Sequence, residues 1–369
     1  MAKDSQKTML DHSKAKVELY GSYLAKYLNI ISRDGYTKKI HIYDLFCGEG
    51  IYDNGGKGSP VIALEAVQKN FGSNPYFCPN MKVLFNDLDT GKIEKLKTIT
   101  ESLTFPEKCN VHFSSKDYNI VLQEVLTELK KYTNEKGIVF IDPYGYKEIK
   151  LENIKNILEG KKTEVLLFLP SQFMFRFANS AKDDSTGGKE HLHRFIHDVF
   201  GEDVPDFKNS IDFIDGLKTG FKQYLKNYFV DTFTLEREKG QFFALYFFTS
   251  HIKGFEKMLE TKWELDETQG RGFHYEKSGT LFSSTETNDW EGKLKEYITS
   301  GKRYNGDVYE FTLHSGFLPK HTNQILKSWQ DEKQMTVIAS EGEKARKGAF
   351  YLNYDLYNAL PKKVLFKMN

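Results

Sequence analysis

The sequence lacks the features that mark secreted, membrane-spanning and metal-binding proteins. Its three cysteines, Cys47, Cys78 and Cys109, are an odd number at wide spacing, which argues against a disulfide framework and against a CxxC metal-ligand pair. No apolar run approaches the length that spans a bilayer, and the first residues lack the apolar core of a signal peptide. We therefore predict a cytoplasmic protein with no membrane segment and no metal site.

The sequence also lacks an excess of charge of one sign. Lysine and arginine number 52 and aspartate and glutamate number 51, so any nucleic-acid-binding surface must be local. At 369 residues, of which 39% are hydrophobic, the chain is long enough for two domains or for one large domain with an appendage.

What is present is a regular alternation of strand-like and helical segments. After an amphipathic helix at about residues 12–32, apolar runs alternate with helical patterns and lie at 40–46, 82–85, 111–114, 137–141 and 165–169. This order predicts a doubly wound α/β fold with a mostly parallel sheet, which a hairpin of 229–235 and 242–249 closes in antiparallel fashion. We expect a first domain over 1–265 with a helical insertion at about 171–228, a linker over 266–288, and a second domain over 289–369.

A glycine-containing loop follows the first predicted strand. Asp44, Phe46, Gly48 and Gly50 lie where that strand ends, which is the edge at which open α/β sheets bind ligands. Glycine there lets the backbone pass close under a ligand, and Ser59 is the predicted N-cap of the next helix. Because the loop does not match G-x-G-x-x-G, it favours a nucleoside with an amino-acid tail over a dinucleotide.

Carboxylates follow the next two strands at the same edge. Asp87 is the candidate acceptor for ribose hydroxyls, with Asp89 as second choice, and Asp117 is the candidate acceptor for an adenine amino group. The alternative for each is a loop residue or a helix cap. Their order after successive strands favours a ligand site.

The most informative string is the fourth strand and the turn after it. There the strand delivers Asp142, Pro143 and Tyr144 to the ligand edge. Hydrogen bonds to Asp142 and to the Pro143 carbonyl would orient an exocyclic base nitrogen, whose lone pair is otherwise conjugated with the ring, while Tyr144 would stack on the base. The alternative is an ordinary turn after a strand, for which Asp-Pro and Tyr-Gly are typical.

Taken in this order, the motifs resemble those of the three-Cys-motif partner (TcmP) family. The residues that carry the resemblance lie within roughly 10–275, at 44–50, 58–60, 86–87, 142–145 and 245–263. The resemblance implies a Rossmann-like methyltransferase sheet, S-adenosylmethionine as cofactor, and a companion protein that carries the three cysteines of the family's name. The cysteines of the present chain are therefore not that motif.

Asp142-Pro143-Tyr144 is also similar to the Asp/Asn-Pro-Pro-aromatic motif of methyltransferases that act on the adenine amino group. It lacks the second proline, and Asp-Pro-aromatic-Gly is closer to the motif of certain tRNA guanine-N2 methyltransferases, so the target base stays open. The chain contains no Pro-Cys dipeptide, so the nucleophile of cytosine-C5 methylation has no candidate.

The C-terminal segment predicts a winged-helix-like module. Residues 290–369 carry 13 Lys/Arg against 9 Asp/Glu, and three helical patterns precede a predicted hairpin of 336–340 and 349–353. The residues expected to meet nucleic acid lie on the third helix and at the hairpin tip: Lys320, Asn323, Gln324, Lys327, Arg346 and Lys347. Winged helices also bind proteins, and a charged tip can simply be solvated.

Three functions follow as hypotheses. The leading one is transfer of the S-adenosylmethionine methyl group to an exocyclic amine of a base in DNA or RNA, with or without the companion protein. The second is a binding protein that keeps the fold and has lost catalysis, which the missing second proline motivates. The third, methylation of a protein or small molecule, has no positive feature in the sequence, and the oligomeric state cannot be predicted from it.

Overall fold

The computed structural model describes residues 8–178, 190–237, 241–267, 270–273, 289–340 and 342–369. The chain divides into two compact units, Met1–Tyr275 and Glu276–Asn369, and each is described by itself. Most of the expected linker over 266–288, and residues 179–189 of the expected insertion, lie outside the described residues.

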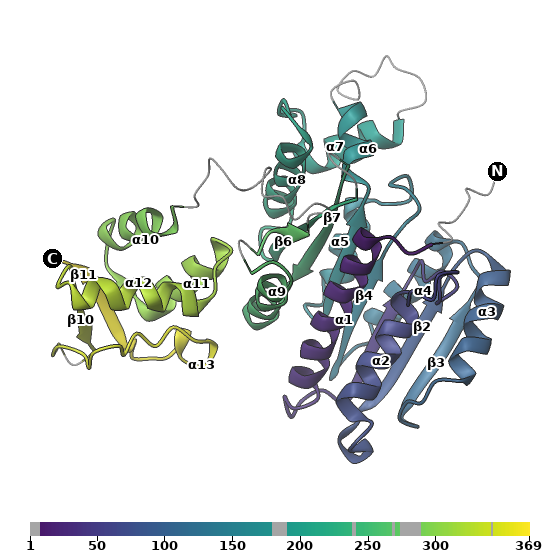
Figure 1. Ribbon diagram of the computed structural model, residues 1–369, viewed down its shortest axis with the longest axis horizontal. Helices are drawn as coiled ribbons and strands as arrows, with labels where there is room; N and C mark the ends of the chain where they lie inside the picture. Colours follow the sequence, from purple (N-terminus) through teal and green to yellow (C-terminus); the bar gives the residue numbers. More distant parts are fainter. Residues whose placement is uncertain (1–7, 179–189, 238–240, 268–269, 274–288, 341) are drawn as a thin grey trace. The chain divides into compact units, whose positions relative to one another are not determined.

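The first unit is built on one eight-stranded sheet in the order β3-β2-β1-β4-β5-β7-β6-β8 (Figure 1). The first five strands are parallel, and β7 runs antiparallel to both of its neighbours, β5 and β6. This topology confirms the doubly wound, Rossmann-like sheet with a closing antiparallel hairpin. The strands are β1 Lys39–Asp44, β2 Asn80–Asn86, β3 Cys109–Ser114, β4 Glu135–Ile141, β5 Thr163–Leu169, β6 Phe229–Glu236, β7 Phe242–Thr249 and β8 Gly272–Phe273.

Helices cover both faces of this sheet (Figure 1). One face carries α1 Asp11–Ile31, α2 Ser59–Phe71, α3 Thr90–Glu101 and α9 Ile252–Leu265. The other carries α4 Tyr118–Leu129, α5 Leu151–Leu158, α6 Ser171–Ala178, α7 Glu190–Phe200 and α8 Ser210–Tyr224. Helices α6, α7 and α8 lie between β5 and β6, in the stretch where the sequence indicated an insertion.

Residue alternation within the central strands explains the two layers. Ile40 and Ile42 of β1 pack toward α1 and α2, whereas Tyr43 packs into the core on the opposite face. In β4, Ile138 and Val139 divide between the same two cores. A parallel strand with helices on both faces must be apolar at nearly every position, which is why these strands read as continuous apolar runs.

Two buried carboxylates tie peripheral helices to the sheet. Glu164 of β5 accepts hydrogen bonds from Tyr23 of α1 and Thr249 of β7, and burial raises its pKa to about 7. Asp231 of β6 pairs with Lys218 of α8 at 2.5 Å and with Lys262 of α9. Burial alone would raise the pKa of Asp231, but the two ammonium groups hold it below its usual range.

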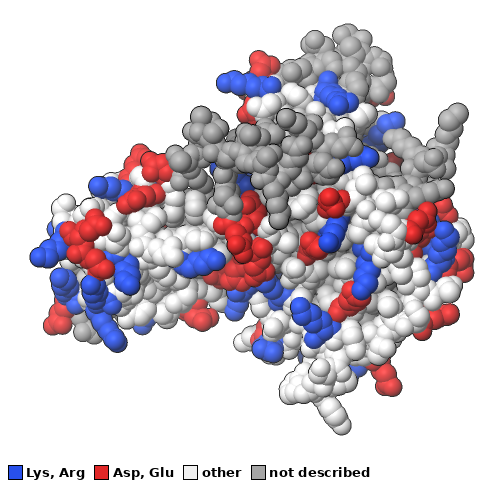
Figure 2. All heavy atoms as spheres, in the orientation of Figure 1, with Lys and Arg blue, Asp and Glu red and all other residues white. Residues whose placement is uncertain are grey.

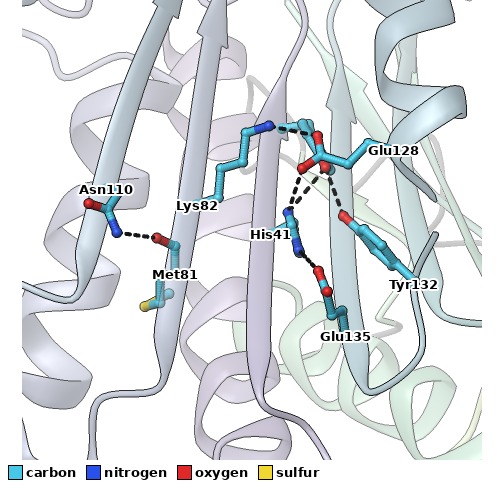
Figure 3. A network of polar contacts seen from close by, with 8 residues as sticks. His41, Met81, Lys82, Asn110, Glu128, Tyr132 and Glu135 are labelled. Atoms are coloured by element: carbon cyan, nitrogen blue, oxygen red, sulfur yellow. Dashed lines mark hydrogen bonds and ion pairs between the residues drawn. The ribbon is translucent and has the colours of Figure 1, made fainter.

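A further polar network lies between β1, β2, β4 and α4 (Figure 3). His41 of β1 is fully buried and contacts the carboxylates of Glu128 and Glu135, and Glu128 also binds Lys82 at 2.6 Å. Burial lowers the pKa of His41 despite these carboxylates. The polar groups satisfy one another within the otherwise apolar sheet.

The second unit contains α10 Trp290–Thr299, β9 Arg303–Tyr304, α11 Asn305–His314, α12 Pro319–Asp331, β10 Met335–Ala339, α13 Tyr354–Tyr357 and β11 Val364–Met368. Its sheet has the order β10-β11-β9. The three helices and β10 lie where the sequence predicted them, but the strand expected at 349–353 is wrong. Tyr351 adopts a φ of 54°, which is incompatible with an extended strand, and β11 pairs with β10 instead.

Within the described part of the chain, no helix combines the length and the apolar character needed to cross a bilayer.

Candidate active site

A cleft of about 260 Å³ lies at the carboxyl ends of β1, β4 and β5. Asp44 of β1 lies level with Phe85 of β2 and Phe140 of β4, so the loops after these strands meet at one edge. Among the residues predicted for the site, the cleft is lined by Phe46, Gly48, Gly50, Ser59, Asp142, Pro143 and Tyr144. The fold therefore brings the glycine loop and the motif after β4 together.

The glycine loop has a backbone that only glycine adopts without strain. Gly48 and Gly50 have φ values of 66° and 86°. A Cβ on Gly48 would meet no atom within 4 Å, so it would project into open space beside the cleft, whereas one on Gly50 would lie 2.7 Å from Leu96 Cδ1. Gly48 thus keeps the loop surface clear, and Gly50 permits close packing on α3.

Asp44 and Ser59 form a pair at the base of the loop. Ser59 was predicted to cap α2, but the N-cap is Gly58, and Ser59 is the first helical residue. Its hydroxyl instead donates to Asp44 Oδ2 at 2.6 Å. Asp44 is fully buried, and burial, reinforced by the negative charges of Asp142 and Asp87, raises its pKa to about 7. Asp44 therefore supports the start of α2 from behind the cleft lining.

Asp87 makes more contacts than the ribose prediction supposed. Its carboxylate accepts the backbone N–H of Gly48 at 3.1 Å, that of Asp89 at 2.9 Å, and the Tyr144 hydroxyl at 3.1 Å. Only 2% of Asp87 is exposed, and it lies behind the lining. Asp87 therefore joins the glycine loop to the motif after β4.

Two other acidic candidates are helix caps. Asp117 accepts the backbone N–H of Asn119 at the start of α4, and Asp89 accepts those of Gly91 and Lys92 at the start of α3. Neither lines the cleft. Both carboxylates therefore act as N-caps, which was the alternative to a ligand contact.

Asp142 forms an ion pair that the sequence did not indicate. Its Oδ2 binds the ammonium of Lys16, which lies on α1 and is 126 residues away in the sequence. Among the described residues Lys16 is the sole hydrogen-bonding partner of Asp142, so its carboxylate does not organise the backbone of the turn. The nitrogen of Lys16 also lies 4.3 Å from the centroid of the Phe168 ring.

Helix α1 supplies a second cleft residue, His12. Its ring stacks on Phe243 of β7 at 5.2 Å, and burial, together with the charges of Lys16 and Arg237, lowers its pKa to about 4. The imidazole is therefore neutral at pH 7, and its Nδ1 has no hydrogen-bonding partner in the described structure. Sequence reasoning missed both residues, although polar side chains at 12 and 16 on the buried stripe that includes Tyr20 were the available signal.

Tyr144 lies at the rim with 54% of its surface exposed. The Lys92 ammonium contacts its hydroxyl and lies 4.6 Å from the centroid of its ring. Burial of the hydroxyl and the charge of Asp87 raise the pKa of Tyr144 above its ordinary value. Tyr144 thus stays neutral and presents an aromatic surface next to the cleft.

The predicted nucleic-acid contacts of the second unit are mostly exposed. Lys320, Gln324 and Lys327 lie one turn apart along the exposed side of α12, whereas Asn323 is half-buried. Arg346 is exposed, and Lys347 is paired with Asp331. Figure 2 shows both Lys/Arg and Asp/Glu over the described residues of the face in view.

No family profile matches the chain, and no curated protein matches it. Solved structures with a remote likeness include Trm1 from Pyrococcus horikoshii with S-adenosyl-L-methionine, at 11% identity and a TM-score of 0.38, covering 70% of this chain and 61% of that one. Two O-methyltransferases are also similar. TomG from Streptomyces achromogenes has 12% sequence identity and a TM-score of 0.33, and the match covers 62% of this chain and 79% of that one. The enzyme from Bacillus cereus has 9% identity and a TM-score of 0.31, and the match covers 62% of this chain and 80% of that one. The assignment of the fold rests on the strand order itself.

Proposed function

We propose that this protein is an S-adenosylmethionine-dependent methyltransferase that acts on an exocyclic amine of a nucleic-acid base. The observation that carries the proposal is the convergence of the glycine loop and Asp142-Pro143-Tyr144 on one cleft at the carboxyl edge of a Rossmann-like sheet. The likeness to TcmP proteins, the companion protein and the choice between DNA and RNA stay predictions.

The loop residues suit a nucleoside with an amino-acid tail. The open space beside Gly48 and the positive φ of Gly48 and Gly50 leave backbone groups accessible to a ligand. Ser59 and Phe46 complete the wall next to the loop. When bound, S-adenosylmethionine supplies an electrophilic methyl group.

The residues after β4 suit a conjugated amine. The Asp142 carboxylate can accept an N–H of that amine and thereby direct its lone pair, and the Pro143 carbonyl can accept the second N–H. Because Oδ1 of Asp142 makes no hydrogen bond within the described structure, it is free for this contact. The exposed ring of Tyr144 offers a surface for stacking.

Titration of the protein with S-adenosylmethionine and S-adenosylhomocysteine tests the cofactor assignment, and a matched pair of glycines sharpens it. Gly48→Ala should weaken binding at least ten-fold, because the added Cβ enters the cleft. Gly55→Ala imposes comparable backbone strain, at a φ of 79° with open space around its Cβ, but lies outside the lining and should leave binding intact. Equal effects of the two variants, or no binding by the unaltered protein, would contradict the assignment.

Incubation of total nucleic acid with labelled cofactor tests the transfer and identifies the modified nucleoside. A binding protein without catalysis is the second candidate, and one observation favours it: the Asp142 and Tyr144 side chains already bind Lys16 and Asp87. Cofactor binding without label in DNA, RNA or protein of a cell extract would support this second candidate.

A further inference from the structure

We propose that Lys16 binds the carboxylate of the cofactor's amino-acid tail, so that one ammonium group is shared between that carboxylate and Asp142. The inference rests on the proposed function and deepens it, because it names the residue that recognises the tail. It follows from three features of Lys16: its burial, its unused donors and its place in the cleft.

Lys16 is a buried cation with only one acceptor. Its side chain is 8% exposed, and within the described part of the chain Asp142 is its sole hydrogen-bonding partner. An ammonium has three N–H donors, so two of them have no acceptor among the described residues. Burying a charged donor without acceptors is unfavourable, which indicates that the site is built for an additional anionic or polar group.

The surroundings of Lys16 restrict what that group can be. Lys16 lines the same cleft as Gly48, Gly50 and Ser59, which are the residues that suit a nucleoside with an amino-acid tail. The ring of Phe168 lies 4.3 Å from the nitrogen and offers no strong acceptor. A ligand carboxylate beside the loop would supply the missing acceptors and compensate the positive charge.

The other cations of the cleft are less suited to this contact. Lys92 contacts the Tyr144 hydroxyl, which itself donates to Asp87, and makes no contact with Asp142 among the described residues. Arg237 adds its charge next to His12 and has interactions of its own. Lys16 is the cation that adjoins Asp142, and sharing it would place the tail of the cofactor beside the carboxylate that receives the target amine.

The test compares two ligands that differ in the tail. S-Adenosylhomocysteine carries the carboxylate, and 5′-methylthioadenosine has the same adenosine and thioether without it. In Lys16→Met, calorimetry should show a loss of S-adenosylhomocysteine affinity of roughly 10- to 100-fold, the equivalent of one charge-assisted hydrogen bond. Affinity for methylthioadenosine should change less than about two-fold, and Lys16→Arg should recover most of the loss.

Lys92→Gln and Asp142→Asn are the matched controls. Lys92→Gln removes a cation from the same cleft and should affect the two ligands alike. Asp142→Asn removes the negative charge that faces Lys16 and should not reproduce the selective loss. The inference is overturned if Lys16→Met weakens both ligands equally, if Asp142→Asn mimics it, or if Lys92→Gln shows the tail selectivity instead. Should Lys16→Met fail to fold, Lys16→Gln allows the same comparison. If the unaltered protein binds neither ligand, the proposed function itself fails.

Discussion

Removal of the Asp87 carboxylate should destabilise the site before it affects any ligand. Three donors converge on it, from Gly48, Asp89 and Tyr144, and 2% of the residue is exposed. A hydrogen bond to a charged group contributes about 1.5–3 kcal/mol, and two of the three donors are backbone groups that would lose their acceptor. Allowing for partial rehydration of the exposed Tyr144, we expect Asp87→Ala to lower the free energy of unfolding by roughly 2–4 kcal/mol.

The magnitude can be measured against a neighbour. Asp89→Ala removes an exposed N-cap two residues away and should cost about 1 kcal/mol. Tyr144→Phe removes only one of the three donors to Asp87 and should cost about 1 kcal/mol or less. Thermal unfolding followed by circular dichroism gives the order, and hydrogen exchange over residues 44–58 locates the effect in the glycine loop.

The reasoning is refuted if the free energies of unfolding of Asp87→Ala and Asp89→Ala differ by less than about 0.5 kcal/mol and hydrogen exchange of the loop amides is unchanged. If it is correct, a loss of cofactor affinity in Asp87→Ala cannot be assigned to ribose recognition alone. Tyr144→Phe then separates the structural role of Asp87 from ribose recognition, because it leaves the Asp87 carboxylate in place.

Three other results are expected. Between pH 5 and 8 the unaltered protein should lose about 2.5 kcal/mol of stability relative to Glu164→Gln. The pKa of Glu164 is about 7 in the folded state against 4.5 when unfolded, so its stabilising contribution is full below pH 4.5 and is lost as the pH rises through 7; parallel stability curves from urea titrations would refute this. Asp142→Ala removes the acceptor for the target amine and should keep cofactor affinity while methyl transfer falls by at least 100-fold; retained turnover in single-turnover assays would exclude Asp142 from orienting the amine. If the second unit binds nucleic acid, Lys327→Gln should reduce the slope of log affinity against log salt concentration by about one. Lys347→Gln should change this slope less, because Lys347 is already ion-paired with Asp331. Equal slopes for the two variants would contradict binding of nucleic acid by the exposed side of α12.

The layers of the first unit could be predicted from sequence because each signal was local. Parallel strands covered on both faces give continuous apolar runs, and amphipathic helices give a period near 3.6 residues, so neither depends on knowing the partner. The glycine loop and Asp142 followed from the rule that such sheets bind ligands at the carboxyl edge.

The partners of the site could not be predicted in the same way. The ion pair between Lys16 and Asp142 arises from the packing of α1 beside β4, across 126 residues of sequence. Ser59 has a side chain typical of an N-cap, but the buried carboxylate of Asp44 needs a donor more than the helix terminus does. In the case of Ser59, the local preference for a capping position was overruled by the buried carboxyl group of Asp44.

The error in the second unit has a similar origin. Phe350 and Leu352 are buried and alternate with exposed residues, which is the pattern of a half-buried strand. An alternation of apolar and polar residues indicates which side chains are buried, but it does not show that the segment pairs with another strand. The left-handed backbone conformation of Tyr351 prevents this segment from forming an extended strand.

The cluster at Asp231 constrains the order in which its residues can change during evolution. One carboxylate serves two lysines, of which Lys262 is buried and Lys218 is half-buried. Loss of either lysine leaves one lysine paired with Asp231, whereas loss of Asp231 leaves both lysines without this carboxylate. Substitutions at the three positions should therefore be epistatic: an apolar residue at 231 becomes acceptable only after both lysines have been replaced. In a library of random variants, lineages that lose this charge cluster should lose the lysines first.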